Sequence, residues 1–407
     1  MPDDNRALEP FLRVPSPEQE VRLAELEAAL ASQRAAVDEP DPEDAERYGA
    51  FLRDAPDAAG VAWAEAEVTA AESIGGAALA VQPDRSVLAS GANPDKDEHV
   101  LTLRTDAVGQ RLLLLEALGD ESHFEGRVGR ADNGNAVLTS IAVEAVSVAD
   151  PGRREPVPLV WAWADHEQAD GDFDVVNALS DDARGWAVDA HRADGGRTAL
   201  FLAERPFGYE GGTELVVRLA YRSVYARHTL GRVRLTPGAI DSAARLPVAD
   251  TRWYTADGFR PASRLSGYDH AFGPEAGLDL TASWPARELP STEAEPKHVQ
   301  WRFNADLADG ALFNSFQQGQ VVTYSAKRLF APTARTLAVS LGSDDGVQVY
   351  LDGEQVFENR VDRGAAPDQD AFELSVPAGV HDLVVKTITT GGQGGLYWRA
   401  TDDGAPL

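Results

Sequence analysis

Two adjacent acidic residues, Asp344 and Asp345, are the first place in this sequence where chemistry could be located. They stand in the run GSDDGVQVYLDGEQVFENRV, directly before an alternation of apolar and polar residues that is typical of a β-strand. Neighbouring carboxylates repel each other, so they need a cation, backbone donors or water. The pair therefore indicates a metal or sugar site, a turn in which Gly346 relieves the backbone, or a contribution to solubility alone. The residues by themselves favour the turn over the metal.

A second group of oxygen-bearing side chains, Asp132, Asn133 and Asn135, lies in the run RADNGNAV, just before another strand. These side chains could hold a metal ion on a loop. The dipeptide Asn133-Gly134 is equally an ordinary hairpin turn, because both residue types tolerate a left-handed backbone. Both interpretations remain open, and the turn is the preferred one.

Three alternating aspartates, Asp170, Asp172 and Asp174, follow in the run ADHEQADGDFD. Their spacing is similar to the opening of an EF-hand loop. The distal bidentate glutamate and the flanking helices of that motif are missing, so a calcium loop of this type is not expected. We predict a solvated acidic loop instead.

Two tryptophans, Trp161 and Trp163, lie in the run LVWAWAD. Residues two apart on a strand point to the same face of the sheet, so the two rings should lie together. On an open face they would form a stacking platform for sugar rings. Tryptophan more often supplies buried area, and we therefore favour a place in the core.

The composition excludes several classes of site. The sequence has no cysteine, which rules out disulfides, thiolate nucleophiles, iron–sulfur clusters, Cys-based zinc sites and haem attached through C-x-x-C-H. Its 8 histidines share no short metal-ligand spacing, and there is no H-E-x-x-H, G-x-S-x-G or Walker motif. Carboxylate pairs at glycosidase-like distances would arise by chance among 66 acidic residues. We therefore expect no catalytic residues and no haem.

The charge of the chain excludes other partners. The formal net charge is −29, from 66 acidic and 37 basic residues. Such a field repels phosphate, so neither nucleic acid nor an anionic membrane surface is an expected partner. No apolar run reaches the length of about 18 residues that a membrane span needs. The opening residues MPDDNRALEPFLRVPSPEQE have no basic n-region or apolar h-region, so no secretory signal is expected there.

The elements that position these residues can be read from the hydrophobic period. Residues 1–60 predict a helical hairpin. Ser16 is its first N-cap, Gln19 completes a capping box, and Asp41 caps a second helix. From Val61 onward the period changes to two, in short runs separated by Gly, Asp, Asn and Pro, which predicts antiparallel sandwiches. Residues 61–238 form a first predicted sandwich, 239–250 a linker and 251–407 a second sandwich. Within the second, Asp352-Gly353 is the strongest hairpin signal.

The sequence also resembles a known family. The runs SVLASGANPDKDEHVLTL, RVGRADNGNAVLTSIAVE, GWAVDAH and HTLGRVRL resemble the sandwich module of large planctomycete cytochrome-c-type surface proteins. The runs YDHAFGPEAGLDL and GSDDGVQVYLDGEQVFENRV look like a second module of that family, and like sugar-binding sandwiches attached to glycoside hydrolases. The resemblance implies galactose-binding-like jelly rolls at an extracytoplasmic surface. It also implies carbohydrate as ligand, and protein partners that bear the haem and conserved domains. This chain has no haem motif, so the redox role of the family is not carried over.

The same resemblance implies calcium. In the protective-antigen-type and flocculin-type sandwiches, an Asp-Asp pair like Asp344 and Asp345 holds Ca²⁺, and the ion holds sugar hydroxyls. Galactose-binding-like sandwiches often keep a structural calcium on a loop such as that of Asp132, Asn133 and Asn135. Calcium prefers several hard oxygen ligands, which both loops could supply.

Together these observations predict a mainly β protein with two tandem antiparallel β-sandwich domains behind a helical hairpin. The expected function is non-catalytic carbohydrate binding or scaffolding, assisted by calcium, with Trp161, Trp163, Asp344 and Asp345 as ligand-binding residues. A purely structural spacer is the main alternative. A glycosidase or lyase on a jelly roll is a weaker one, and it would need a cleft with two acids of divergent pKa.

Overall fold

The computed structural model of the chain describes residues 16, 19, 21–23, 25–26, 60–180, 184–288 and 297–406. The chain divides into two compact units, Met1–Ala58 and Ala59–Leu407, which we describe separately.

In the first unit the predicted capping box is confirmed. The Ser16 N–H donates to Gln19 Oε1 (2.9 Å), and the Gln19 N–H donates to Ser16 Oγ (3.3 Å). Residues 19, 21–23 and 25–26 are helical, and Leu23 and Leu26 are exposed. The second predicted helix, from Asp41, lies outside the described residues, so the helical hairpin stays a prediction.

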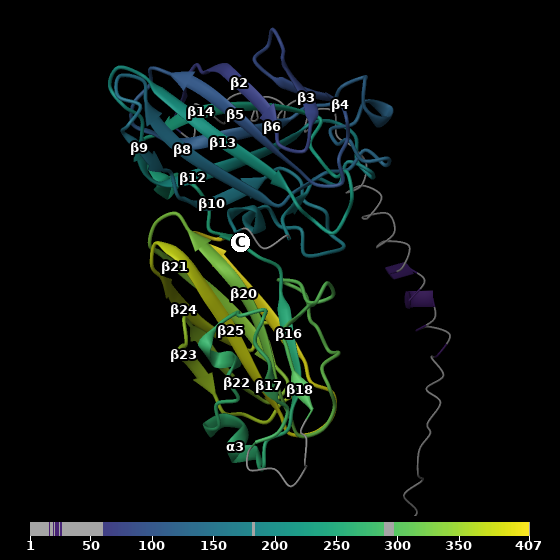
Figure 1. Ribbon diagram of the computed structural model, residues 1–407. Helices are drawn as coiled ribbons and strands as arrows, with labels where there is room; N and C mark the ends of the chain where they lie inside the picture. Colours follow the sequence, from purple (N-terminus) through teal and green to yellow (C-terminus); the bar gives the residue numbers. More distant parts are fainter. Residues whose placement is uncertain are drawn as a thin grey trace, which may run out of the picture. The chain divides into compact units, whose positions relative to one another are not determined.

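The second unit is mainly β and consists of two successive sandwiches, and Figure 1 labels many of their strands. Every pairing between its named strands is antiparallel, which confirms the predicted fold class. The first sandwich contains β1 to β14, and the second contains β15 to β27.

The first sandwich packs a large sheet against a smaller one. The large sheet has the order β10 (Leu159–Ala164), β12 (Arg197–Phe207), β6 (Gln110–Ala117), β14 (Arg232–Ile240), β4 (Val87–Gly91) and β3 (Ala77–Val81), with β1 (Val61–Trp63) paired to β14. The smaller sheet has the order β2 (Glu67–Ser73), β5 (Asp97–Thr105), β13 (Thr213–Tyr221), β8 (Ser140–Ser147) and β9 (Arg154–Pro156). Outside them, β7 (Val137–Leu138) pairs with β11 (Trp186–Ala187), and the 3-10 turns η1 (Phe124–Gly126) and η2 (Val175–Leu179) lie in loops.

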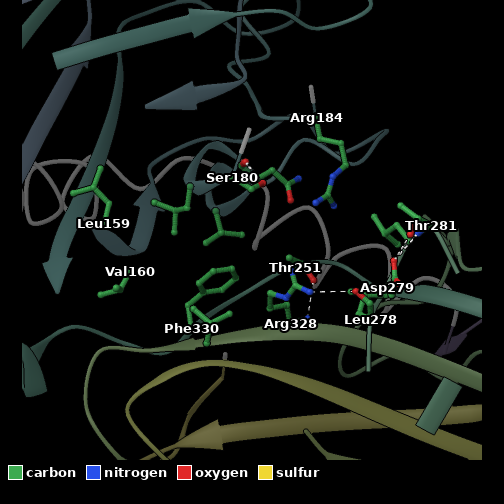
Figure 2. Close-up of a pocket in the computed structure, with 15 residues that line it drawn as sticks. Leu159, Val160, Ser180, Arg184, Thr251, Leu278, Asp279, Thr281, Arg328 and Phe330 are labelled. Carbon is green, nitrogen blue, oxygen red and sulfur yellow. Dashed lines mark hydrogen bonds between the residues drawn. The ribbon is translucent and has the colours of Figure 1, made fainter. Parts of the chain in front are cut away.

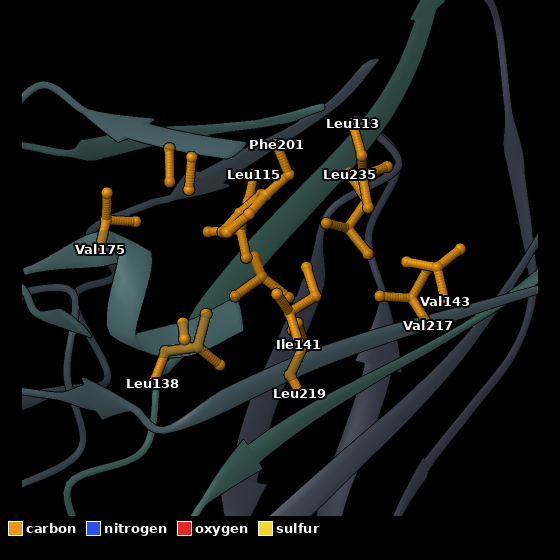
Figure 3. Close-up of a cluster of buried hydrophobic side chains, with 14 of the residues drawn as sticks. Leu113, Leu115, Leu138, Ile141, Val143, Val175, Phe201, Val217, Leu219 and Leu235 are labelled. Carbon is orange, nitrogen blue, oxygen red and sulfur yellow. The ribbon is translucent and has the colours of Figure 1, made fainter. Parts of the chain in front are cut away.

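The core of the first sandwich follows from the period of two. Along β13, Leu215, Val217 and Leu219 are fully buried, and the residues between them face outward or are only partly covered. Figure 3 shows such side chains from both sheets meeting in one layer. Alternation therefore set which face of each strand is buried.

The second sandwich is built the same way. One sheet has the order β19 (Arg302–Phe303), β16 (Tyr254–Phe259), β20 (Val321–Ala331), β25 (Gly379–Thr389), β22 (Gly346–Leu351) and β23 (Glu354–Asn359), with β15 (Ala249–Asp250) paired to β20. The other has the order β24 (Asp370–Val376), β21 (Arg335–Ser343), β26 (Leu396–Asp402) and β27 (Ala405–Pro406). The connecting segments contain β17 (Trp284–Pro285) paired with β18 (His298–Val299), α3 (Arg264–Asp269), η3 (Ala243–Arg245) and η4 (Pro274–Ala276).

One sheet of the second sandwich is buried on both faces. Strand β20 has ten buried residues and one half-buried residue, where a half-exposed strand would alternate. One of its faces meets the other sheet, with Leu329 and Ala331 in that core. The opposite face, with Val322 and Tyr324, is covered by a second cluster that includes Tyr268 of α3. The segment that links β16 to β20 therefore serves as a cover for the sheet.

The hairpin predicted at Asp352-Gly353 is confirmed. Strands β22 and β23 pair from Val347–Asn359 to Leu351–Glu354, with these two residues at the tip. Asp352 has φ 51° and Gly353 has φ 82°. Two positive φ values are the signature of the type I′ turn that suits the twist of a hairpin.

Candidate functional site

Asp345 is held firmly by the fold. It lies in the turn between β21 and β22 with φ 55°, a left-handed conformation that Asp tolerates better than most residues. Its carboxylate accepts hydrogen bonds from the Arg363 N–H (3.0 Å) and from the N–H and hydroxyl of Thr390 (2.8 and 2.6 Å). Asp345 thus joins three loops, in the manner that the turn interpretation predicts, and its oxygen atoms already have donors.

Asp344 is in a different state. It is half-buried, and its own N–H donates to the Gly395 carbonyl (3.0 Å). Burial raises the pKa of its carboxyl to about 6, the charge of Asp345 adds to this rise, and a hydrogen bond from the Ala365 backbone opposes it. No lysine or arginine from the described part of the chain is among the groups that oppose the rise. Asp344 therefore has no cationic partner among the described residues.

Three further loops meet beside Asp344. A Cβ atom added to Gly395 would lie 2.2 Å from Asn314 Oδ1 and 2.9 Å from the Phe313 carbonyl oxygen, so a larger residue here would require these neighbours to shift. The segments that carry Phe313 and Leu396 are held together by two backbone hydrogen bonds: the Phe313 N–H donates to the Leu396 carbonyl (2.9 Å), and the Leu396 N–H donates to the Phe313 carbonyl (2.8 Å). We call Asp344, Asn314, Ala365 and Gly395 the Asp344 cluster.

The Asp344 cluster offers a set of hard oxygen atoms. The carboxylate of Asp344, the amide oxygen of Asn314 and nearby carbonyls are ligand types that calcium prefers. Asp345 would add negative charge, because its own oxygens are engaged. Within the described residues, no three His, Cys, Asp or Glu side chains gather closely enough to hold a metal. A cation here would therefore depend on amide and backbone oxygens as well as on Asp344.

Sequence reasoning missed the residues that build this loop cluster. Arg363 lies 18 residues after Asp345, and Thr390 lies 45 residues after it. The Arg363 guanidinium also donates to Ser343 Oγ (3.0 Å) and pairs with Asp370. No local pattern announces such contacts, although the glycine-rich run that ends at Gly395 marks a close approach of backbones.

The side chains of the Asp132 loop do not converge on one point. Asp132 is exposed and forms a bidentate pair with Arg227 (2.7 and 3.1 Å). Asn133 Oδ1 accepts from the Asn135 N–H (3.0 Å). The buried Asn135 carboxamide accepts from the Ala190 N–H (3.1 Å) and donates to a glutamine of another loop (3.0 Å). These oxygen atoms serve three separate contacts, so a calcium site on this loop remains a prediction with no geometric support.

The acidic loop with Asp170, Asp172 and Asp174 is not the solvated loop that the sequence predicts. Only Asp170 is mainly exposed, where it pairs with Arg192. Asp172 binds Arg184 (3.3 Å) and the Tyr254 hydroxyl. Asp174 is 2% exposed. The prediction fails because residues of the second sandwich cover this loop.

Arg252 is the main cover of that loop. Its guanidinium donates to three backbone carbonyls of residues 168–171 (2.7 to 2.9 Å), and its Nε contacts Asp174 Oδ1 (2.8 Å). Burial raises the pKa of Asp174 to about 6 in spite of Arg252. Burial raises the pKa of nearby Glu167 further, to about 7, and the charge of Asp174 adds to the rise. This junction between the sandwiches is an ordered polar contact in which Glu167 titrates near neutral pH.

The two tryptophans have different surroundings. Trp161 is 1% exposed, and its Nε1–H donates to the Pro247 carbonyl (2.9 Å). Trp163, two residues on along edge strand β10, is 43% exposed. The segment before β15 covers the first ring and leaves the second open. The pair is therefore no continuous platform, and only Trp163 presents an aromatic surface.

A pocket of about 400 Å³ lies between the sandwiches (Figure 2). Apolar side chains dominate its lining, among them Leu159, Val160 and Phe330. The Arg328 guanidinium is engaged by Asp382 (2.8 Å) and the Leu278 carbonyl (3.2 Å). The acid among its described lining residues is Asp279, whose pKa is lowered by donors from Thr281. This lining does not present the pair of acids with divergent pKa that a glycosidase or lyase would need.

Comparison with known proteins places the chain in no family. No family model matches it, and no curated protein is significantly similar. Among solved structures, the PA14 domain of the MpAFP antifreeze protein is similar over 20% of this chain and 45% of that chain, at 14% identity and TM-score 0.17. An anti-sigma factor domain-containing protein from Clostridium clariflavum covers 84% of this chain and 97% of its own, at 9% identity and TM-score 0.24. The apo lectin of Pleurotus ostreatus covers 75% and 76%, at 12% identity and TM-score 0.18. Scores this low carry no functional argument.

Among the described residues, no helix has the length and apolar character to cross a bilayer.

Proposed function

We propose that this chain is a non-catalytic carbohydrate-binding protein that contacts sugar through the Asp344 cluster of its second sandwich, with Ca²⁺ as the bridging ion. The observation that carries the proposal is the half-buried Asp344 carboxylate, which has no cationic partner among the described residues, in a cluster where Gly395 contacts both Asp344 and Asn314. A half-buried carboxylate without a cationic partner is unfavourable unless a bound cation or the hydroxyl groups of a ligand supply the missing positive charge or hydrogen-bond donors.

Calcium fits this donor set better than a transition metal would. The groups at the Asp344 cluster are carboxylate, amide and carbonyl oxygens, and the sequence contains no cysteine. A carboxylate oxygen of Asp344 would coordinate a bound Ca²⁺, and the remaining coordination positions of the ion would be open to sugar hydroxyls. The extracytoplasmic location and the haem-bearing protein partners belong to the same proposal, and they rest on the sequence resemblance alone.

The test is binding of the whole chain to a polysaccharide and glycan panel, with calcium and with excess chelator. We expect retention of at least one glycan in calcium, and its loss in Asp344→Asn with the fold intact by circular dichroism. Asp170→Asn is the matched control, because Asp170 is an exposed loop acid that is paired with Arg192 and lies in neither loop considered for calcium. Retention of no glycan under any condition would refute the proposal and leave a structural spacer as the function.

Calcium itself is tested by thermal unfolding. An ion that binds only the native state stabilises it by about 2.7 kcal/mol when present at about 100 times its Kd. Excess chelator should therefore lower the melting temperature of the wild type and leave Asp344→Asn unchanged. An identical melting curve with and without chelator removes calcium from the proposal and leaves direct sugar binding as the form to test.

A further inference from the structure

A pocket of about 430 Å³ lies in the first sandwich and borders the Asp132 loop. Its lining comes from three loops and includes Asn93, Ser122, His123, Phe124, Arg130 and Asp132. We call it the Phe124 pocket. Its volume is within the range of about 300–1,000 Å³ that small-ligand pockets occupy.

The three loops are locked to one another by hydrogen bonds that use one polar atom of each residue. Asn93 Nδ2 donates to the Arg130 carbonyl (2.7 Å), and Arg130 Nη2 donates to the Gly91 carbonyl (3.0 Å). His123 Nε2 lies 3.0 Å from the Ala89 carbonyl. These bonds fix the side chains that form the pocket.

Each of the same three residues also carries a polar atom with no hydrogen-bond partner in the described structure. These atoms are Asn93 Oδ1, His123 Nδ1 and Arg130 Nη1, and all three are shielded from solvent. Natural proteins leave few buried polar atoms unpaired, and three around one pocket call for an explanation. A ligand in the pocket is such an explanation, after the small rotation of side chains that binding commonly brings.

The chemistry of these atoms defines the ligand. A carbonyl oxygen can only accept, so His123 Nε2–H is the donor to Ala89, and Nδ1 of the neutral ring is an acceptor. The residues that line the pocket therefore carry two unpaired acceptors, on Asn93 and His123, and one unpaired cationic donor, on Arg130, which a change of side-chain rotamer would turn toward a ligand. An anion would satisfy Arg130 alone. A hydroxyl group donates and accepts at once, so neighbouring hydroxyls of a sugar can satisfy all three atoms.

Phe124 supplies an apolar surface for the same ligand. Its side chain is exposed by 46% at the pocket, in a loop whose next two residues have positive φ values of 49° and 72°. The His123 ring is held across Gly231, where an added Cβ would lie 2.2 Å from Cε1. The neighbouring Phe124 ring can therefore lie against the C–H face of a sugar whose hydroxyls reach Asn93, His123 and Arg130.

We infer that the Phe124 pocket is a binding site for a neutral hexose, separate from the Asp344 cluster and independent of calcium. The chain would then have one sugar site on each sandwich. Two sites on one chain raise the apparent affinity for a polysaccharide when both can engage it.

The experiment measures binding of glucose, galactose, mannose and N-acetylglucosamine to the whole chain by calorimetry and ligand-observed NMR. Inorganic sulfate is the anionic comparison. We expect affinity for at least one hexose in the millimolar range, weakened about tenfold by Phe124→Ala. Trp163→Ala is the matched control, because its ring is exposed to a similar extent, 43%, on another surface. Arg130→Lys keeps the charge but loses the planar fork, and should weaken hexose binding as well.

Three results would overturn the inference: no hexose binding by the wild type, unchanged binding in Phe124→Ala, or preference for sulfate over every hexose. Asp344→Asn separates this inference from the proposed function. Hexose binding that survives Asp344→Asn and is lost in Phe124→Ala supports the Phe124 pocket even where calcium-dependent glycan binding is absent. The reverse pattern overturns the pocket and leaves the proposed function standing.

Discussion

Replacing Glu167 by Gln should remove a large part of the pH dependence of stability. The Glu167 carboxylate accepts from the Val175 N–H (2.6 Å), and the amide oxygen of Gln can keep that bond. The charges that act on Glu167 are those of Asp174 and Asp250, which raise its pKa, and Arg252, which lowers it; burial is the largest cause of the rise. The substitution therefore removes one titrating group from the junction between the sandwiches with little change in shape.

The size and sign follow from the raised pKa. Burial and neighbouring acids lift the pKa of Glu167 from its ordinary value of 4.5 to about 7. In this interval the native state holds a proton that the unfolded chain has released, so stability falls as pH rises. One pKa unit corresponds to about 1.4 kcal/mol, and the decline between about pH 5 and about pH 8 amounts to roughly 2–3 kcal/mol for this group. Glu167→Gln should lack that decline.

Urea unfolding of the wild type and Glu167→Gln across this pH range measures the difference directly. Asp170→Asn is the matched control on the same loop, because Arg192 and Gln168 hold the pKa of the exposed Asp170 at about 2. Asp170 stays ionised across the range in both states, so its variant should keep the wild-type slope. Parallel curves for wild type and Glu167→Gln would falsify the assignment of a buried, neutral-pH titration to Glu167.

Three further substitutions test the structural reasoning. Trp161→Ala should cost about 3–5 kcal/mol in urea unfolding, because a buried ring and its bond to Pro247 are lost, whereas Trp163→Ala should change stability by less than about 1 kcal/mol; equal effects would contradict the different burial of the two rings. Gly353→Ala should destabilise by about 1–2 kcal/mol, because its φ is 82°. Gly391→Ala, where nothing lies within 4 Å of an added Cβ, is its control, and a neutral Gly353→Ala would argue against the type I′ turn. Asp345→Ala should cost about 2–3 kcal/mol, since it leaves three donors unpaired, and it should weaken the chelator effect only in part, because it removes a neighbouring negative charge. Complete loss of the chelator effect without loss of stability would make Asp345 a ligand and not a turn residue.

The sequence by itself determined the architecture of the larger unit. The change of hydrophobic period at Val61, the Gly- and Asp-rich breaks and the Asp352-Gly353 turn are local signals, because a strand buries every second side chain and a type I′ turn requires positive φ. The capping box of Ser16 and Gln19 is equally local, and the structure contains it. The resemblance to sugar-binding modules suggested the function, and it remains a proposal.

Only the tertiary structure decided how the candidate residues are used. The two-residue hydrophobic period predicts which face of the sheet a side chain occupies. It does not predict which other segment covers that face. Trp161 and Trp163 have the same parity, yet only Trp161 lies beneath the segment that carries Pro247. The sequence predicts that Asp174 lies in a solvated loop. In the structure it is covered by Arg252, which is 78 residues away in the sequence.

The same reason explains the sites that sequence reasoning missed. The donors to Asp345 come from distant loops, and the unpaired atoms of Asn93, His123 and Arg130 become neighbours only when the first sandwich closes. A hydrogen bond between loops depends on distances of a few tenths of an ångström, which the packing of both sheets sets together. Local sequence patterns determined where the strands lie. The packing of one loop over another determined the exposure and the hydrogen-bond partners of the candidate residues.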